Sequence, residues 1–204
     1  MRHTLTTTLA LSLLAASAAE ALPLFNDTFE SETLGLNQTL DNWSVSDGAI
    51  DVVGDGFFDF YPGNGKYIDL DGSIGDAGKI TTNTLFNFLA GNYILTFQLG
   101  GSTRGDSNSV TVALGSFYSE VFALASNAGL QNITRSFSLG AADGTGALSF
   151  ENAGGDNLGL LLDDVSLDFN RPSSVPEPST IALLSMGGLL AVARRRRAQT
   201  GVGC

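Results

Sequence analysis

Apolar and polar residues alternate in short runs through the middle of this chain. The period of two is clearest in residues 67–70, 93–99, 110–114, 133–139 and 147–150. Pairs such as Asp71-Gly72 and Asn64-Gly65, which favour turns, lie between the runs. Such alternation is typical of strands with one buried face, and only residues 84–90 fit a brief helical turn. Many short strands separated by turns predict an all-β fold, an antiparallel jelly-roll β-sandwich.

The two ends of the chain show a different pattern. A positive start at residues 1–3 precedes an apolar run at 5–19 and small residues, the order of a secretory signal peptide that implies export by the Sec translocon. Cleavage after Ala18 and cleavage after Ala21 both fit, and a membrane-anchoring N-terminal helix is the alternative. Near the other end, the apolar segment 181–193 stops at four consecutive arginines.

The charge and the rare residue types exclude several classes of function. The chain carries a net charge of −11, and residues 22–174 hold five basic and 19 acidic side chains, which gives about −14. Because phosphate binding needs clustered Lys and Arg, nucleic acid is excluded as a partner. The only histidine, His3, and the only cysteine, Cys204, lie outside this region. His- or Cys-dependent catalysis is therefore excluded there, and zinc catalysis is disfavoured for the same reason. One route to catalysis remains, because a glycosidase needs only a pair of carboxylates.

The C-terminal segment resembles a known export signal. Val175, Pro176, Glu177 and Pro178 precede the apolar segment, and the basic block that follows it consists of Arg194, Arg195, Arg196 and Arg197. This order resembles the PEP-CTERM sorting tail of Gram-negative bacteria. The resemblance implies processing by an exosortase-type enzyme and delivery to the cell surface or extracellular matrix. The thirteen residues 181–193 fall short of the ~20 that span a bilayer, so transient insertion in the inner membrane is expected.

Three segments of the middle region, 24–30, 65–72 and 160–167, resemble strands of the galactose-binding-like jelly rolls found among carbohydrate-binding modules. In such modules the first and last strands lie together, and their acidic residues often hold a structural calcium ion. The resemblance implies Glu30 and Asp163 as ligands, with Asp164 and Asp27 as further candidates.

Strand parity places Asp163 with Val165 and Leu167 on the expected core side, where a carboxylate needs a cation or donors. The alternative is that Asp163 lies at a sheet edge, solvated or capping a turn. Asp69, Asp71 and Asp76 form a second acidic group, but their spacing does not match an EF-hand loop and fits an ordinary hairpin turn.

Aromatic residues among turn residues suggest a sugar-binding surface. Residues 55–64 contain four aromatic side chains, and rings stack on the apolar faces of sugars while polar groups bind the hydroxyls. The candidate ring platforms are Trp43, Tyr61 and Tyr118, and the candidate polar partners are Asp59, Asn64 and Arg104. Core packing is the alternative for Trp43 and for the phenylalanines of the loop.

These features predict five parts: a signal-peptide helix (1–21), a β-sandwich domain (22–169), a Pro/Ser linker (170–178), a short apolar membrane helix (179–193) and a basic cytoplasmic tail (194–204). The expected function is that of an exported, non-catalytic surface or extracellular-matrix protein, such as a protein of the biofilm matrix, that associates with exopolysaccharide through its jelly-roll domain. A purely structural or adhesive surface protein is one alternative. A carboxylate-dependent polysaccharide hydrolase or lyase is the other.

Overall fold

The computed structural model describes residues 21–140 and 144–170, and every regular element in these ranges is a β-strand. The brief helical turn predicted at 84–90 is wrong, because Phe86–Asn87 forms a short strand, β6, and pairs with β11 (Thr145–Gly146). The described residues contain no helix long and apolar enough to cross a membrane. The signal-peptide helix and the apolar helix predicted at 179–193 lie outside the described residues.

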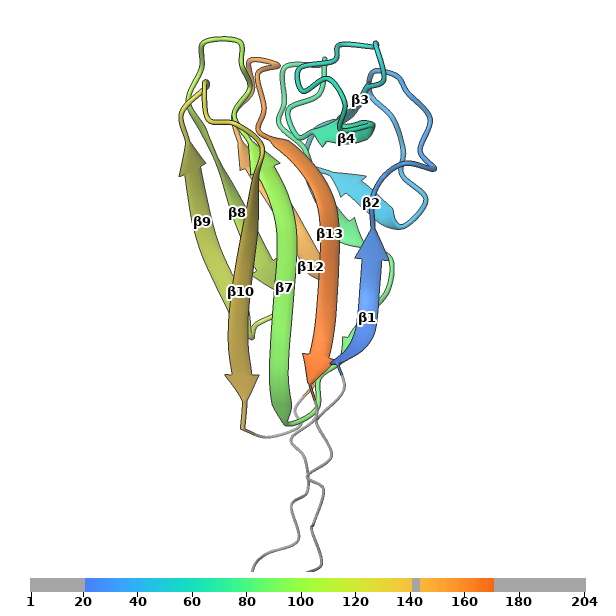
Figure 1. Cartoon of the computed structure of the whole chain (residues 1–204), viewed down its shortest axis with the longest axis vertical. Helices are drawn as coiled ribbons and strands as arrows, with labels where there is room; N and C mark the ends of the chain where they lie inside the picture. Colours follow the sequence, from blue (N-terminus) through green and yellow to red (C-terminus); the bar gives the residue numbers. More distant parts are fainter. Residues whose placement is uncertain (1–20, 141–143, 171–204) are drawn as a thin grey trace, which may run out of the picture. The chain divides into compact units, whose positions relative to one another are not determined.

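Two antiparallel sheets make up the sandwich (Figure 1). One, the β13 sheet, follows the order β10 (Gln131–Leu139), β7 (Gly91–Gly100), β13 (Leu161–Asn170), β4 (Lys66–Asp69) and β3 (Asp51–Gly54), with β1 (Ala21–Asp27) also paired to β13. The other, the β12 sheet, follows the order β2 (Trp43–Ser46), β5 (Lys79–Thr82), β12 (Leu148–Ala153), β8 (Asn108–Leu114) and β9 (Tyr118–Leu124). The antiparallel jelly-roll β-sandwich is confirmed, and the five alternating runs lie in or overlap β4, β7, β8, β10 and β12.

The core lies between the two sheets and follows the alternation in the sequence. In β7 the fully or nearly fully buried side chains are Tyr93, Leu95, Phe97 and Leu99. Across the core, Phe97 meets Phe150 of β12 and Phe122 of β9 edge to face, with ring centroids 5.3 Å apart in each pair. Burial of these large side chains is the main stabilising contribution to such a sandwich, and it fixes the register of each strand.

A β-bulge in β13 reverses one prediction about parity. The register with β7 shifts between Asp163 and Ser166, and Asp164 adopts a positive φ of 48°. Asp163 therefore pairs with Gln98, whose side chain lies on the face of β7 opposite Phe97. Asp163 is buried, as expected. Because a bulge adds one residue to the strand, however, Asp163 does not share the core side with Val165.

The sandwich has two ends of different character. At the terminal end β1 begins and β13 stops, since Ala21 pairs with Asn170 (Figure 1). At the loop end, loops 55–65, 70–78, 101–107 and 154–160 converge. Gly75 N donates to Asn157 Oδ1 at 2.7 Å, which joins two of these loops. The candidate site lies at the loop end.

Candidate functional site

A hollow of about 120 Å³ opens at the loop end between β3, β4 and five loops. Its lining combines apolar and polar side chains: Leu36, Asp51, Val53, Phe58, Phe60, Asp69, Ser73, Arg104 and Asn157. Phe58 is 55 % exposed, and its φ of 46° is rare for a bulky residue. Strained backbone of this kind persists where surrounding structure holds it, and it is found most often at binding sites.

Two aspartates lie directly opposite each other in the wall of this hollow. Asp51 of β3 and Asp69 of β4 are cross-strand partners, and both are at least 96 % buried. Like charges in this relation destabilise a sheet unless other groups compensate them. Asp51 accepts hydrogen bonds from Asn37 N at 2.7 Å and from Ser73 Oγ at 2.6 Å. Asp69 instead forms an ion pair with an arginine.

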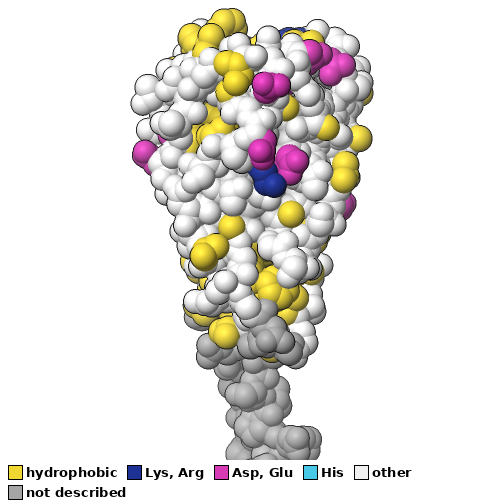
Figure 2. All heavy atoms as spheres, turned by 180° about the vertical axis from the view of Figure 1, so that it is seen from behind, with side chains coloured by type: hydrophobic (Ala, Val, Ile, Leu, Met, Phe, Trp, Pro, Cys, Tyr) yellow, Lys and Arg dark blue, Asp and Glu magenta, His cyan; other side chains and the backbone are white. Residues whose placement is uncertain are grey.

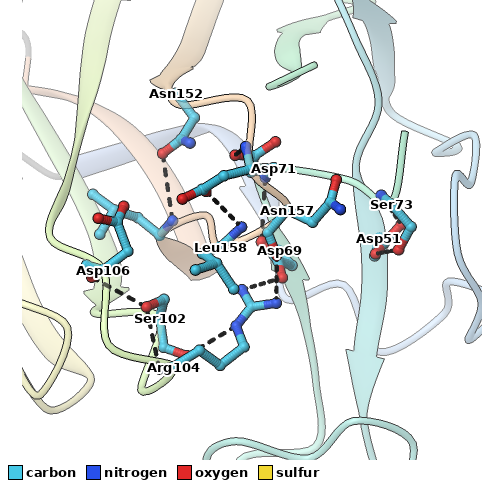
Figure 3. A network of polar contacts seen from close by, with 12 residues as sticks. Asp51, Asp69, Asp71, Ser73, Ser102, Arg104, Asp106, Asn152, Asn157 and Leu158 are labelled. Carbon is cyan, nitrogen blue, oxygen red and sulfur yellow. Dashed lines mark hydrogen bonds and ion pairs between the residues drawn. The ribbon is translucent and has the colours of Figure 1, made fainter. Parts of the chain in front are cut away.

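That arginine, Arg104, joins four segments at the loop end (Figure 3). Its Nη2 donates to Asp69 Oδ2 at 2.5 Å, and its Nη1 donates to Asn157 O at 2.7 Å. The guanidinium lies 4.6 Å from the ring centroid of Phe60, and Nε donates to Ser102 O at 3.2 Å within its own loop. Arg104 therefore holds β4 and loops 55–65, 101–107 and 154–160 in one arrangement.

Burial dominates the electrostatics of Asp69. Loss of hydration raises the pKa of Asp69 to about 7, and Arg104 and a hydrogen bond from Asp71 N only partly offset this rise. Nearby Asp51 raises the pKa of Asp69 further. The wall of the hollow therefore contains a buried carboxyl group that takes up a proton close to neutral pH.

The hairpin turn expected for the second acidic group is wrong, because β4 and β5, the strands before and after it, belong to different sheets. Asp69 ends β4, and Asp71 and Asp76 lie in loop 70–78, which crosses from one sheet to the other. Asp71 is fully buried, and its Oδ2 accepts from Gly155 N at 2.7 Å and from Asp156 N at 3.2 Å. It thereby fixes loop 154–160, which carries Asn157 into the wall of the hollow (Figure 3).

A larger hollow of about 400 Å³ lies along β8 and β9. Small and apolar groups line it: Ser107, Asn108, Ser109, Ala123, Leu124 and Ala125. Neither an aromatic ring nor a charged side chain is among them. Since specific recognition relies on a few converging polar groups, the smaller hollow at the loop end is the better candidate.

Of the predicted ligand-contacting residues, Arg104 alone lines this hollow. The assignment of Trp43 as a ring platform is wrong, because it is 2 % exposed and its Nε1 donates to Asp27 Oδ2 at 2.8 Å inside the core. Core packing, the alternative for Trp43, is what the structure shows. Asp59 accepts from Tyr67 Oη at 3.1 Å, and Asn64 Nδ2 donates to Tyr61 O at 3.1 Å within its own turn.

The two tyrosines also have structural partners. Tyr61 is half-buried, and its hydroxyl lies 2.7 Å from Ala128 O and 2.9 Å from Gly101 O. Tyr118 lies along the edge of the sandwich, where its ring stacks on Phe137 with centroids 5.4 Å apart and its hydroxyl donates to Glu120 Oε2 at 2.7 Å. Burial raises the pKa of both tyrosines. The sequence did not indicate Phe58, Asp51, Asp69 and Asn157 as lining residues of the hollow, and only the aromatic stretch 55–64 pointed towards this region.

The predicted calcium ligands are neighbours, but most already have hydrogen-bond partners. Asp27 accepts from Trp43 Nε1, Glu30 from Lys66 N at 3.1 Å, and Asp164 from Gln98 Nε2 at 2.7 Å. Asp163 accepts only from Asp164 N, at 2.8 Å. Burial, followed by the charges of Asp164, Glu30 and Asp27, raises the pKa of Asp163 to about 7. Over residues 21–140 and 144–170, no three acidic, His or Cys side chains converge as a ready metal site.

Comparison with known families identifies the tail. A model of the PEP-CTERM protein-sorting motif matches residues 174–197, so the predicted sorting signal is confirmed. The motif implies export and membrane-anchored sorting to the cell surface. Comparison of the sequence with curated proteins gives no significant match.

Solved structures similar to the sandwich include carbohydrate-binding modules. One is the module of Cellvibrio mixtus lichenase 5A in complex with cellotriose, at 15 % identity and a TM-score of 0.43, covering 74 % of this chain and 99 % of that one. The xylan-binding domain of Paenibacillus barcinonensis Xyn10C matches at 13 % identity and a TM-score of 0.44, and the match covers 78 % of this chain and 100 % of that domain. The cleaved adhesin domain K3 of Porphyromonas gingivalis Lys-gingipain matches at 19 % identity and a TM-score of 0.45, and the match covers 72 % of this chain and 98 % of that domain. These identities are too low for residue roles to be carried over.

Proposed function

We propose that this chain, which carries a PEP-CTERM sorting motif, is an exported, non-catalytic protein of the extracellular matrix that binds exopolysaccharide at the loop end of its sandwich. An exosortase-type enzyme would process the tail after transient insertion in the inner membrane of a Gram-negative bacterium. The mature sandwich would then remain at the cell surface or in the matrix.

One observation carries the binding proposal: an exposed ring, held with strained backbone, stands over a hollow of converging polar groups. Phe58 and Phe60 offer apolar rings for the face of a sugar. Asn157 and Arg104 supply groups that can bond to sugar hydroxyls. Asp69 supports the site indirectly, because its Oδ2 holds the Arg104 guanidinium in the wall of the hollow.

The proposal is tested by retention of the purified sandwich domain on the producer's own exopolysaccharide. We expect Phe58→Gly to weaken binding about tenfold, equivalent to ~1.4 kcal/mol, without loss of stability, because glycine adopts the positive φ at this position freely. Val121→Ala is the control, since Val121 is 62 % exposed on β9 and lies outside the lining of the hollow.

Two results would contradict this proposal. Absence of retention by the folded domain would favour a purely structural or adhesive protein. Release of new sugar ends by the same preparation would favour a hydrolase or lyase, with Asp51 and Asp69 as the carboxylate pair to substitute first.

We also propose that calcium binds beside Asp163. The support is chemical: a buried carboxylate with three acidic neighbours gains from a hard cation that prefers oxygen ligands. Glu30, Asp164 and Asp27 are the candidate partners. The ion would hold the first strand against the last, next to the bulge.

A further inference from the structure

The terminal end of the sandwich exposes large apolar side chains that neither the core nor the loop-end hollow uses. Leu85 is 65 % exposed, Leu22 49 %, Leu89 44 % and Leu24 36 %. Single exposed leucines are ordinary on protein surfaces, but a group of them at one end marks a surface that contacts a partner or a membrane.

Strand pairing and packing place these leucines at the same end. Leu22 pairs with Phe169 near the end of β13. The ring of Phe169 packs 4.9 Å from that of Tyr93, and the Tyr93 hydroxyl accepts from Leu89 N at 2.8 Å. Leu85 directly precedes β6, whose Phe86 ring lies 6.0 Å from that of Phe25 in β1.

Charge is distributed in the opposite way. The described segments of the terminal end are 21–25, 84–93, 115–117, 139–140, 144–148 and 166–170, and Asp168 is the one charged residue among them. Figure 2 shows hydrophobic side chains without acidic ones beside the terminal end, and acidic side chains farther away. The loop end, by contrast, holds Asp51, Asp69, Asp71, Asp106 and Asp156.

The chain connections favour a lipid surface as the occupant. Only eight residues, 171–178, lie between Asn170 and Ser179, the first residue of the predicted apolar membrane helix, and this connection reaches at most about 30 Å. Strands such as the ten-residue β7 extend about 33 Å towards the loop end. An acidic loop end at that distance lies beyond the Debye length of about 10 Å, and is therefore screened from anionic lipid headgroups.

We propose that the terminal end of the sandwich docks on the interface of a phospholipid bilayer, through Leu22, Leu24, Leu85 and Leu89, while the chain still carries its sorting tail. The inference rests on the proposed function, because it assumes that the tail brings the chain to a membrane. Docking inserts leucine side chains at the boundary between headgroups and acyl chains. It directs the loop-end hollow away from the membrane and holds the Pro-Glu-Pro segment close to the lipid surface, where a membrane enzyme processes it.

Two labelled variants of the full chain test this orientation. Cys204 is the only cysteine, so Cys204→Ser permits a single fluorophore at Leu85→Cys or, as the control, at Ile74→Cys. Ile74 is 57 % exposed and belongs to loop 70–78 at the loop end, so the two labels have matched exposure. On phosphatidylcholine vesicles with brominated acyl chains, we expect quenching at position 85 to exceed quenching at position 74 at least threefold. Leu22→Ser with Leu89→Ser should reduce that ratio towards one.

Each other outcome overturns the inference. Equal quenching of both labels on a chain that floats with vesicles shows that the tail alone holds the chain to lipid. Quenching that needs an added membrane protein fraction indicates a protein partner for the terminal end. A chain that does not float with vesicles contradicts both docking and the membrane step of the proposed function, whereas retention on exopolysaccharide tests the hollow independently of all three.

Discussion

The two ends of this sandwich differ in how their side chains are arranged. At the loop end, buried carboxylates are held by backbone N–H groups, hydroxyls and one arginine around a hollow. At the terminal end, leucines remain exposed and charged residues are almost absent among the described segments. Polar networks fix loops in one geometry because every misplaced partner is costly, whereas an apolar surface gains only when a partner removes it from water. The difference indicates a preformed site at one end and a contact surface at the other.

The largest test of this contrast is the removal of Arg104. We expect Arg104→Ala to lower the free energy of unfolding by about 3–5 kcal/mol at pH 8, because Asp69 is left buried without its cation. At pH 5 the loss should be smaller, since Asp69 can take up a proton. Urea denaturation at both pH values measures the difference.

A matched arginine provides the control for this experiment. Arg135 also pairs with a carboxylate, Glu120 at 2.6 Å, and also lies over a ring, Phe122 at 4.9 Å. Its pair is more than a third exposed, so Arg135→Ala should cost no more than about 1 kcal/mol. Equal losses for the two variants would contradict the special role of the loop-end network.

The pH dependence of stability is the next largest effect. The pKa of Asp69 is raised to about 7 in the folded domain, so between its unfolded pKa of about 4 and pH 7 the folded state binds more protons. Stability from this group is therefore greatest at low pH and falls as pH rises, by about 2–3 kcal/mol from pH 5 to pH 8. Asp163, whose pKa is also raised to about 7, should add a fall of similar size. Chemical denaturation across this range should therefore show both contributions, and Asp69→Asn should remove only the share of about 2–3 kcal/mol that belongs to Asp69. An unchanged slope in that variant would assign the dependence to other carboxyl groups.

Calcium gives the smallest effect and tests whether an ion also compensates the acidic residues. With free calcium at about tenfold the Kd, stabilisation should be about 1.4 kcal/mol, and a chelator should lower the melting temperature accordingly. The stability difference between Asp163→Asn and the parent should change sign with calcium. In chelator the variant should be as stable as the parent or more stable, since a buried charge is gone. In calcium the variant should be less stable than the parent. A melting temperature that does not respond to chelator would count against the ion.

The alternating runs were sufficient to predict most strands, since burial of one face is a local property that repeats along the chain. They could not predict the bulge at Asp163, because one extra residue moves a side chain to the other face without changing composition. The same limit applies to Thr84–Ala90, where Phe86–Asn87 forms a strand only because Gly146 and Thr145 are available as partners.

For the candidate site, the aromatic stretch at 55–64 indicated the right loop but not the right ring. Tyr61 turns inward to reach carbonyl groups 40 and 67 residues away, while Phe58 remains exposed. Trp43 is held in the core by Asp27 of another strand. Such assignments depend on partners distant in the sequence.

The sequence by itself determined the strand pattern, the acidic character, the absence of His and Cys from the region between the end segments, and the sorting signal confirmed at 174–197. Each is a property of neighbouring residues or of composition. Only the tertiary structure decided that Asp51 faces Asp69, that Arg104 joins four segments, and that exposed leucines and buried carboxylates occupy opposite ends. These features arise from contacts between segments far apart in the chain, which sheet pairing brings together and which no local pattern records.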